Sequence, residues 1–170
     1  MPSQQVYLMR HAETEWRVSG QHTDLTDIPL TENGRSVAKL LKPVLTKETF
    51  ALVLTSPLQR ARETCALAGL GGFAKVDRNL MEWNYGEYEG LTPQQIQAKT
   101  PGWMVFTDGC PGGESPEQVG ARIDRVIARV RATEAMWPCS GTATCLESLR
   151  RGGSDSAPRM EVISSSIRRR

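Results

Sequence analysis

Short apolar runs alternate along this chain with longer segments in which apolar residues recur at helical spacing. Residues 6–9 and 51–55 are continuous apolar runs of strand length, and residues 73–76 form a third, shorter candidate. Continuous runs of this kind are typical of strands that are buried on both faces of a parallel sheet. The pattern therefore predicts two buried strands and a third candidate strand in the first half of the chain.

Capping residues mark the helical segments as clearly as periodicity does. Thr31 is the predicted cap of a helix that extends to about residue 45. Ser56 caps a second helix that runs to about residue 69, with Pro57 in its first turn. The remaining helices are a short one after Thr92-Pro93 and a long one that begins at Ser115-Pro116 and carries Val119, Ile123, Val126, Ile127 and Val130 on one face.

Alternating strands and helices predict an α/β fold, a mainly parallel sheet flanked by helices with right-handed crossovers. After Pro138 the chain changes character, because all aromatic residues precede this point and residues 139–170 are rich in Ser, Arg and Gly. An α/β sheet of this kind would be expected to have one more buried strand after the long helix, but the sequence shows no strand pattern there. We therefore expect a domain over residues 1–138, incomplete at its C-terminus, and a disordered tail over residues 139–170.

Composition narrows the class of protein. With 170 residues, 39% hydrophobic and 24% charged, the chain has the size and balance of one soluble domain. A formal net charge of +2 gives no indication of nucleic-acid or membrane binding, and no apolar run reaches the length of a membrane span. The cysteines, at positions 65, 110, 139 and 145, lack metal-type or CxxC spacing, so a cytoplasmic location is expected.

Candidate chemistry lies where the first two strands end. Arg10 and His11 follow the first strand, and Arg60 follows the second. Because the carboxyl ends of parallel strands share one edge of the sheet, these side chains are expected to converge there. A neutral imidazole attacks phosphorus, and two guanidinium groups hold phosphoryl oxygens and offset their charge. This arrangement predicts a phosphoryl-transfer site that needs neither a metal nor a cofactor.

Glu82 is the predicted general acid of this site. It lies in the segment L-M-E-W-N-Y-G-E-Y-E-G, among apolar and aromatic neighbours that favour a protonated carboxyl group. A leaving alkoxide needs such a proton. Glu13, Glu87 and Glu89 are expected to cap helices or to pair locally instead.

Five motifs, in this order, resemble those of the histidine phosphatase superfamily, also called phosphoglycerate-mutase-like: R-H-A-E-T, L-T-E-N-G, S-P-L-Q-R-A-R-E-T, L-M-E-W-N-Y-G-E-Y-E-G and G-G-E-S. The resemblance covers about residues 5–136, and residues 19–23 and 108–115 are similar to the sugar-bisphosphatase-like branch. It implies that His11 becomes phosphohistidine, that Arg10 and Arg60 bind the phosphoryl group, and that Glu82 donates the proton. It also implies that Gln21, His22 and Thr23 line the substrate side.

The sequence departs from this family pattern in three places. Ala12 and Arg17 stand where many members have Gly and Asn, and both changes are interpreted as tolerable. The family also carries a second catalytic histidine after the long helix, whereas the chain's two histidines are His11 and His22. We therefore expect weak or absent activity, since one missing donor in such a site costs about 10² to 10³ in rate. In this family the missing segment also supplies a central strand and a covering helix, so poor stability is expected as well.

The codons of residues 142–144 suggest an origin for the missing histidine. Thr142-Ala143-Thr144 is compatible with ACG GCC ACG, and a Gly141 codon that ends in C then gives CAC GGC CAC, or His-Gly-His, in the neighbouring frame. With GC-rich codons, residues 144–154 read in that frame can yield a segment that resembles the family's next helix. We hypothesise that the reading frame slips near Pro138, so that residues 139–170 are unrelated to the family.

The predicted function is hydrolysis of a small phosphorylated metabolite, of the sugar phosphate class, with no nucleic-acid or membrane partner and with the oligomeric state left open. A phosphoglycerate-type mutase is the nearest alternative, but Lys99 is the only basic residue between Trp83 and Val119, which favours hydrolysis. A catalytically dead remnant that only binds phosphate ligands is the other alternative, and it is supported by the missing histidine.

Overall fold

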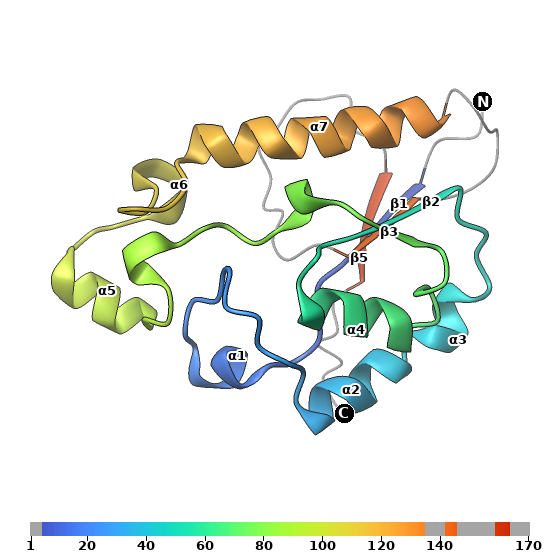
Figure 1. The fold of residues 1–170 in the computed structure, drawn as a ribbon, viewed down its shortest axis with the longest axis horizontal. Helices are drawn as coiled ribbons and strands as arrows, with labels where there is room; N and C mark the ends of the chain where they lie inside the picture. The colour runs from blue at the N-terminus through green and yellow to red at the C-terminus, as the bar shows by residue number, and fades with distance from the viewer. Residues whose placement is uncertain (1–4, 135–141, 146–158, 164–170) are drawn as a thin grey trace.

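A five-stranded sheet, parallel throughout, forms the centre of the computed structural model, which describes residues 5–134, 142–145 and 159–163 (Figure 1). Its strand order is β3-β2-β4-β1-β5. The strands are β1 (Gln5–Met9), β2 (Leu52–Thr55), β3 (Ala74–Val76), β4 (Thr142–Cys145) and β5 (Arg159–Ile163). The predicted α/β fold with a mainly parallel sheet is confirmed, and so are the three strands expected in the first half of the chain.

The strand β4 lies in the middle of the sheet, between β1 and β2. Its last residue, Cys145, is in register with Met9 of β1 on one side and with Thr55 of β2 on the other. The carboxyl ends of these three strands therefore share one edge. This edge is where Arg10 and His11 leave β1.

The expectation that residues 139–170 form a disordered tail is wrong for two segments, β4 and β5. Thr142–Cys145 is too short to show a periodic pattern, but β1 and β2 each leave one row of backbone groups that needs a partner. A four-residue segment placed between them gains hydrogen bonds on both sides. Tertiary pairing thus overrides a weak local signal. The rest of the expected tail lies outside the described residues.

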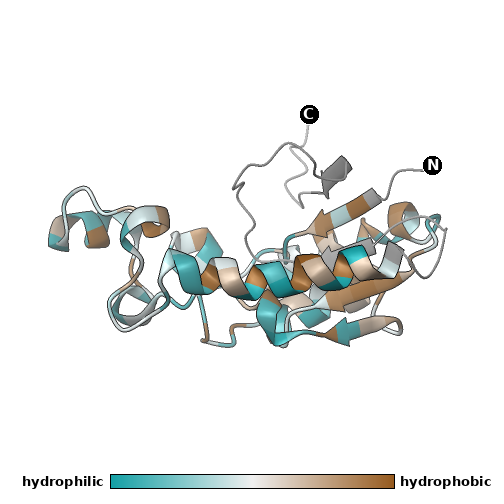
Figure 2. Ribbon diagram, turned by 90° about the horizontal axis from the view of Figure 1, so that it is seen from above, coloured by the Kyte–Doolittle hydropathy of each residue, from teal (hydrophilic) through white to brown (hydrophobic). Residues whose placement is uncertain are grey.

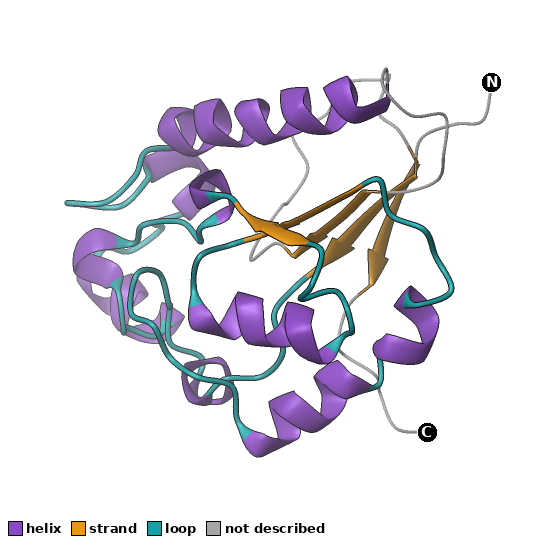
Figure 3. Cartoon of the chain, turned by 45° about the vertical axis from the view of Figure 1, so that its right-hand side comes forward, coloured by secondary structure: helices purple, strands orange, loops and turns teal. Residues whose placement is uncertain are grey.

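Helices cover both faces of the sheet. In Figure 3, α7 lies across one face, and α2, α3 and α4 lie across the other. The helices are α1 (Glu15–Ser19), α2 (Glu32–Lys39), α3 (Lys42–Leu45), α4 (Gln59–Leu67), α5 (Pro93–Lys99), α6 (Val105–Asp108) and α7 (Pro116–Glu134), with short 3₁₀ turns at η1 (Arg78–Leu80) and η2 (Gly86–Tyr88). Within the described residues, no helix is both long and apolar enough to cross a bilayer.

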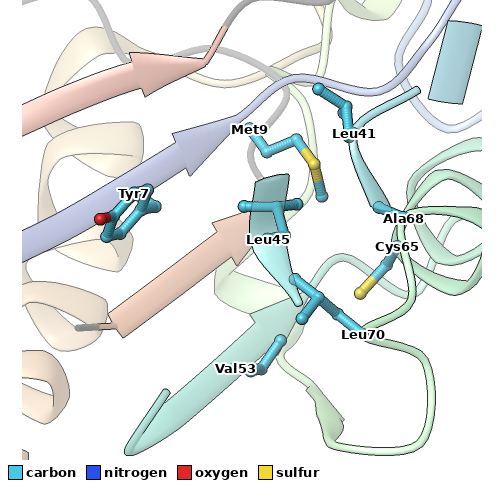
Figure 4. Close-up of a cluster of buried hydrophobic side chains, with 8 residues drawn as sticks. All are labelled: Tyr7, Met9, Leu41, Leu45, Val53, Cys65, Ala68 and Leu70. Atoms are coloured by element: carbon cyan, nitrogen blue, oxygen red, sulfur yellow. The ribbon is translucent and has the colours of Figure 1, made fainter. Parts of the chain in front are cut away.

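Alternate residues of the strands pack into two separate hydrophobic cores, one on each face of the sheet. Tyr7 and Met9 of β1 pack with Val53 of β2 on the side of α3 and α4 (Figure 4). Leu41, Leu45, Cys65, Ala68 and Leu70 complete this cluster. On the opposite face Val6, Leu8, Leu52, Leu54 and Leu80 meet Val126 and Val130 of α7, along which apolar and polar positions alternate in Figure 2. Burial on both faces explains why residues 6–9 and 52–54 form continuous apolar runs.

Two predicted helices differ in detail from the observed ones. The helix capped by Thr31 is interrupted, because Pro43 has no N–H group with which to continue the ladder, and α3 begins anew around it. The helix predicted to begin at Ser56-Pro57 begins at Gln59 instead, since Leu58 is extended. The first amide of α4 is bound by a distant residue, with Gln59 N–H donating to the Asp27 carboxylate at 2.7 Å. Ser56 is therefore not its cap.

The segment between η1 and α7 forms a third cluster at one end of the molecule. Trp83, Tyr88, Ile96 and Cys110 are its buried members, and α5 and α6 lie beside them, away from the sheet (Figure 1). The short helix predicted after Thr92-Pro93 is α5, and Thr92 caps it in a reciprocal arrangement with Gln95. This cluster supports the backbone that carries Glu82 and Tyr85 toward the sheet edge.

Candidate active site

The imidazole of His11 is buried at the carboxyl end of β1, where 4% of the residue is exposed. Its Nδ1 lies 2.7 Å from the Ala12 carbonyl oxygen, which accepts only, so Nδ1 carries the proton. The lone pair of the neutral ring is then on Nε2. The next residue is anchored as well, because Ala12 N–H donates to Thr64 Oγ1 of α4 at 3.0 Å. The loop after β1 and the helix after β2 are thus joined directly behind the imidazole.

Burial is the main cause that lowers the pKa of His11, from its ordinary 6.5 to about 3, and the hydrogen bond to Ala12 acts in the opposite direction. The charges of Arg10, Arg60 and Arg17 add to the lowering. The imidazole is therefore neutral at physiological pH. A neutral ring surrounded by guanidinium groups is arranged as a nucleophile toward an anionic group.

A cavity of about 70 Å³ opens beside His11. It collects side chains from the end of β1, from α1, from the loop that follows α1, and from the segment after η1. The residues that line it are Arg10, His11, Thr14, Arg17, Gln21, His22, Thr23, Glu82 and Tyr85. All the site residues predicted from the sequence are among them, with the exception of Arg60.

Arg60 lies in the wall behind this pocket and is fully buried in the first turn of α4. Its Nη1 donates to the Thr26 carbonyl and its Nη2 to the Asp24 carbonyl, each at 2.9 Å. Its charge nevertheless acts on the His11 imidazole. The side chain is thus oriented by backbone carbonyls and contributes positive potential to the pocket.

Glu82 enters the pocket from the segment that follows η1, and 6% of the residue is exposed. Its Oε1 accepts a hydrogen bond from Trp83 N–H at 2.9 Å. Arg122 of α7 holds the backbone of this segment, since its guanidinium donates to the carbonyls of Met81 at 2.7 Å and Glu82 at 3.0 Å. The carboxyl group is therefore placed by a fixed backbone that the long helix supports.

The rim of the pocket is formed by Gln21, His22 and Thr23. The His22 ring stacks on Tyr85, with ring centroids 4.5 Å apart and an interplanar angle of 19°. Gln21 Nε2 donates to the Gly90 carbonyl at 2.8 Å, so the rim is tied to the segment after η2. Burial lowers the pKa of His22 below its ordinary value. The rim therefore presents a neutral aromatic pair and two polar side chains to the pocket.

The sequence reasoning missed three lining residues, Thr14, Arg17 and Tyr85. Thr14 caps α1 by accepting from Arg17 N–H at 3.3 Å, which places Arg17 over the pocket. In the described part of the chain, the guanidinium groups of Arg10 and Arg17 form no ion pair with a carboxylate. The departure of Arg17 from the family pattern was a usable signal, because it adds a positive charge beside His11.

The described residues include no group of three or more His, Cys, Asp and Glu side chains placed to hold a metal ion. The polar groups of the pocket are cationic or neutral apart from Glu82. This balance suits an anionic ligand bound by guanidinium groups.

Comparison with known families matches residues 6–137 to the histidine phosphatase superfamily, branch 1. An acid phosphatase of Mycobacterium tuberculosis is 44% identical over 123 residues, which are 71% of this chain. A sedoheptulose 1,7-bisphosphatase of Saccharomyces cerevisiae is 35% identical over 161 residues, or 81% of this chain. The chain spans 60% and 59% of the lengths of these two relatives.

Among solved structures, the complex of mycobacterial glucosyl-3-phosphoglycerate phosphatase Rv2419c with VO3 superimposes with a TM-score of 0.72 at 31% sequence identity. The match covers 82% of this chain and 74% of the other. Sequence and fold therefore point to the same set of proteins.

Proposed function

This chain belongs to the histidine phosphatase superfamily, and we propose that it is a phosphomonoesterase that transfers a phosphoryl group from a small metabolite to His11 and then to water. The observation that carries the proposal is the pocket in which a buried, neutral imidazole faces the guanidinium groups of Arg10 and Arg17 and the carboxyl group of Glu82.

In the first step, Nε2 of His11 attacks phosphorus and the bond between phosphorus and the ester oxygen breaks. Nδ1 keeps its proton, held by the Ala12 carbonyl, and so stabilises the positive charge that develops on the ring. Arg10 binds the phosphoryl oxygens, with Arg17 beside it and Arg60 behind, as the negative charge on these oxygens redistributes. Binding of the dianion also offsets the repulsion among the three guanidinium groups.

Glu82 donates a proton to the departing alkoxide, which leaves as an alcohol. The resulting carboxylate then accepts a proton from the water that attacks the phosphohistidine. The N–P bond breaks, inorganic phosphate is released, and both His11 and Glu82 return to their starting forms. The cycle is balanced by the substrate and one water molecule.

We propose a sugar phosphate as the substrate. The sedoheptulose bisphosphatase among the relatives supports this class, and so does the rim of Gln21, His22 and Thr23, whose polar and aromatic groups suit a hydroxylated ligand. We also propose a cytoplasmic location, which is supported by the free thiols of Cys65 and Cys110.

The absence of a histidine after residue 22 favours one alternative, a remnant that binds phosphate ligands without turning them over. The two alternatives differ in whether a covalent bond forms between His11 and phosphorus. The full chain is therefore incubated with a radiolabelled sugar phosphate and quenched at alkaline pH, where phosphohistidine survives. Label on His11, lost in His11→Ala, supports the enzyme; an unlabelled chain that still binds phosphate identifies the remnant and overturns the proposal.

A matched pair of variants on α4 tests the anion-binding wall. Arg60 is buried beside the site, whereas Arg62 is exposed one half-turn away on the same helix. Arg60→Ala is expected to lower kcat/KM by about 10²-fold or more, because a preorganised charge is lost from the site. Arg62→Ala is expected to leave it unchanged. Equal losses in both variants would show that α4 acts only as a structural support.

A further inference from the structure

Asp24 is a buried acid that the proposed chemistry does not use. Only 1% of the residue is exposed, and it does not line the pocket. Its Oδ2 accepts from Tyr85 N–H at 2.6 Å, and its Oδ1 accepts from Leu25 N–H. The carboxyl group therefore reaches from the loop after the pocket rim to the segment that carries Tyr85, whose ring forms part of the pocket wall.

The same loop determines where the Arg60 guanidinium lies. The carbonyl oxygens of Asp24 and Thr26 accept its two Nη groups. Asp27, at the end of the loop, binds the first amide of α4. A fully buried guanidinium has no water with which to exchange partners, so a displacement of this loop displaces Arg60 with it.

Glu89 completes the connection from the other side. Its Oε1 accepts from Thr26 N–H at 2.8 Å, and its carboxyl group faces that of Asp24 closely enough for the two ionisations to be coupled. Burial, followed by the contact with Glu89, raises the pKa of Asp24 to about 6. Burial also opposes ionisation of Glu89, but the contacts with Asp24 and Thr26 outweigh it and lower the pKa of Glu89.

We propose that Asp24 is a positioning residue of the phosphoryl-binding pocket: its carboxyl group binds the segment that carries Tyr85, Glu89 binds the same loop through Thr26, and together they hold the loop that orients Arg60. The proposal rests on the proposed function, since it describes how that pocket is kept in shape. It assigns a role to two acids that touch neither the substrate nor His11.

A pH dependence follows from this role. The titratable or charged groups around Asp24 are Glu89 from the segment after η2, the Cys110 thiol from the turn before α7, and Arg60 from α4, which binds the Asp24 carbonyl; His22 is two residues away in the same loop. Burial, with the charges of Asp24 and Glu114, raises the pKa of Cys110 to about 11. His22 loses its charge at lower pH than an ordinary histidine. Above about pH 6 the Asp24 carboxyl group loses its proton and two carboxylates face each other. Their repulsion is expected to move the loop away from segment 85–89.

The experiment measures the dissociation constant of inorganic phosphate for the full chain between pH 5 and pH 8, by ³¹P NMR. Because phosphate itself titrates near pH 7 and phosphate esters near 6, the informative quantity is the ratio of wild type to Asp24→Asn at each pH. The amide keeps a neutral donor toward Glu89 at every pH. At pH 5 wild type and Asp24→Asn are expected to bind phosphate equally well. At pH 8 wild type is expected to bind about fivefold to tenfold more weakly than Asp24→Asn, which corresponds to a shift of about one pKa unit in Asp24 on phosphate binding.

Two further variants separate positioning from folding. Glu89→Gln also removes the repulsion and is expected to flatten the ratio as Asp24→Asn does, whereas Glu87→Gln, on the exposed side of the same segment, should keep the wild-type dependence. A ratio that stays constant with pH, or one that Glu87→Gln alters equally, overturns the positioning role while leaving the proposed function intact. Failure of every variant and of wild type to bind phosphate overturns the proposed function itself, and the positioning role with it.

Discussion

The carboxyl ends of β1 and β4 lie side by side in the sheet and differ in what they carry. Met9 and Cys145 are register partners, and both strands point to the same edge. After Met9 the chain supplies Arg10 and His11, which enter the pocket. The sequence that forms β4, Thr-Ala-Thr-Cys, brings no imidazole to that edge. A strand can therefore take its place in the sheet through backbone hydrogen bonds alone, without bringing a catalytic side chain to the site.

Because of this difference, the β4 strand end supplies no imidazole to the pocket as described, and the site is formed by the β1 end and the segments around it. The walls around His11 come from segments 10–23 and 82–85, supported by Arg60 behind. They provide the nucleophile, the acid and the anion-binding groups. The neighbouring strand end is where the family's second histidine is expected, and the hypothesis of a displaced reading frame puts the codons of His-Gly-His within β4 itself, at residues 142–144.

The largest predicted effect comes from restoring that strand. Inserting one nucleotide among codons 138–141 brings the neighbouring frame into use and gives a frame-restored chain. We predict that it hydrolyses a sugar phosphate about 10²- to 10³-fold faster than the present chain, because a second preorganised donor then faces the phosphoryl group. The measurement is kcat with both chains at equal concentration.

The matched control is the frame-restored chain with alanine codons in place of the two histidine codons, which should return to the rate of the present chain. The hypothesis is abandoned if the gene lacks CAC GGC CAC in the neighbouring frame. It is also abandoned if the restored chain is no faster than the alanine control.

Periodicity and caps were sufficient to predict most of the fold, because the elements that matter are apolar on both faces or amphipathic over many turns. The strands β1 and β2, the capped start of α2 and the long helix α7 all follow from local patterns. The start of α4 did not, since the residue that binds its first amide is Asp27, on a distant loop. The strand β4 did not either, because its stability comes from its neighbours rather than from its own four residues.

The site divides in the same way. His11, Arg10 and Glu82 were predicted from motifs, and the structure brings them to one pocket. The partners that hold the pocket in shape were not predicted, because nothing near Asp24 in the sequence indicates that it meets Glu89 and Tyr85. Contacts between residues some sixty positions apart depend on the folded backbone alone.

Burial of His11 at the end of β1 is also predicted to make the free energy of unfolding depend on pH. The unfolded chain protonates His11 near its ordinary pKa of 6.5, whereas the folded chain keeps the ring neutral down to about pH 3. The unfolded state thus binds more protons between these values, and stability falls as pH drops through this window. Between pH 7 and pH 4.5 this group alone costs about 2 kcal/mol of the free energy of unfolding.

Urea unfolding at pH 7 and pH 4.5 measures this effect, with His11→Gln as the comparison because glutamine does not titrate. The loss on acidification should be smaller in His11→Gln than in wild type by about 2 kcal/mol. Equal losses in the two chains would mean that the folded imidazole is accessible to protons, which contradicts its burial.

A smaller effect is expected from the packing that holds the loop after His11. Gly34 of α2 lies against the backbone of Glu13, and a Cβ atom there would overlap the Glu13 carbonyl oxygen, which also accepts from Thr31 N–H at 3.0 Å. Gly34→Ala is therefore predicted to destabilise the chain by about 1–2 kcal/mol, overpacking outweighing the gain in helix propensity. It should also lower kcat, because residues 12–13 continue directly from His11.

Gly120, in the interior of α7, provides the matched substitution. It is exposed, and a Cβ atom there meets nothing within 4 Å. Gly120→Ala should stabilise the chain by about 0.5–1 kcal/mol through helix propensity and leave kcat unchanged. If Gly34→Ala destabilises the chain and Gly120→Ala stabilises it, the close packing that matters lies at the contact between α2 and the loop after β1. Stabilisation by both would show that this loop yields, so that the position of His11 does not depend on close packing against α2.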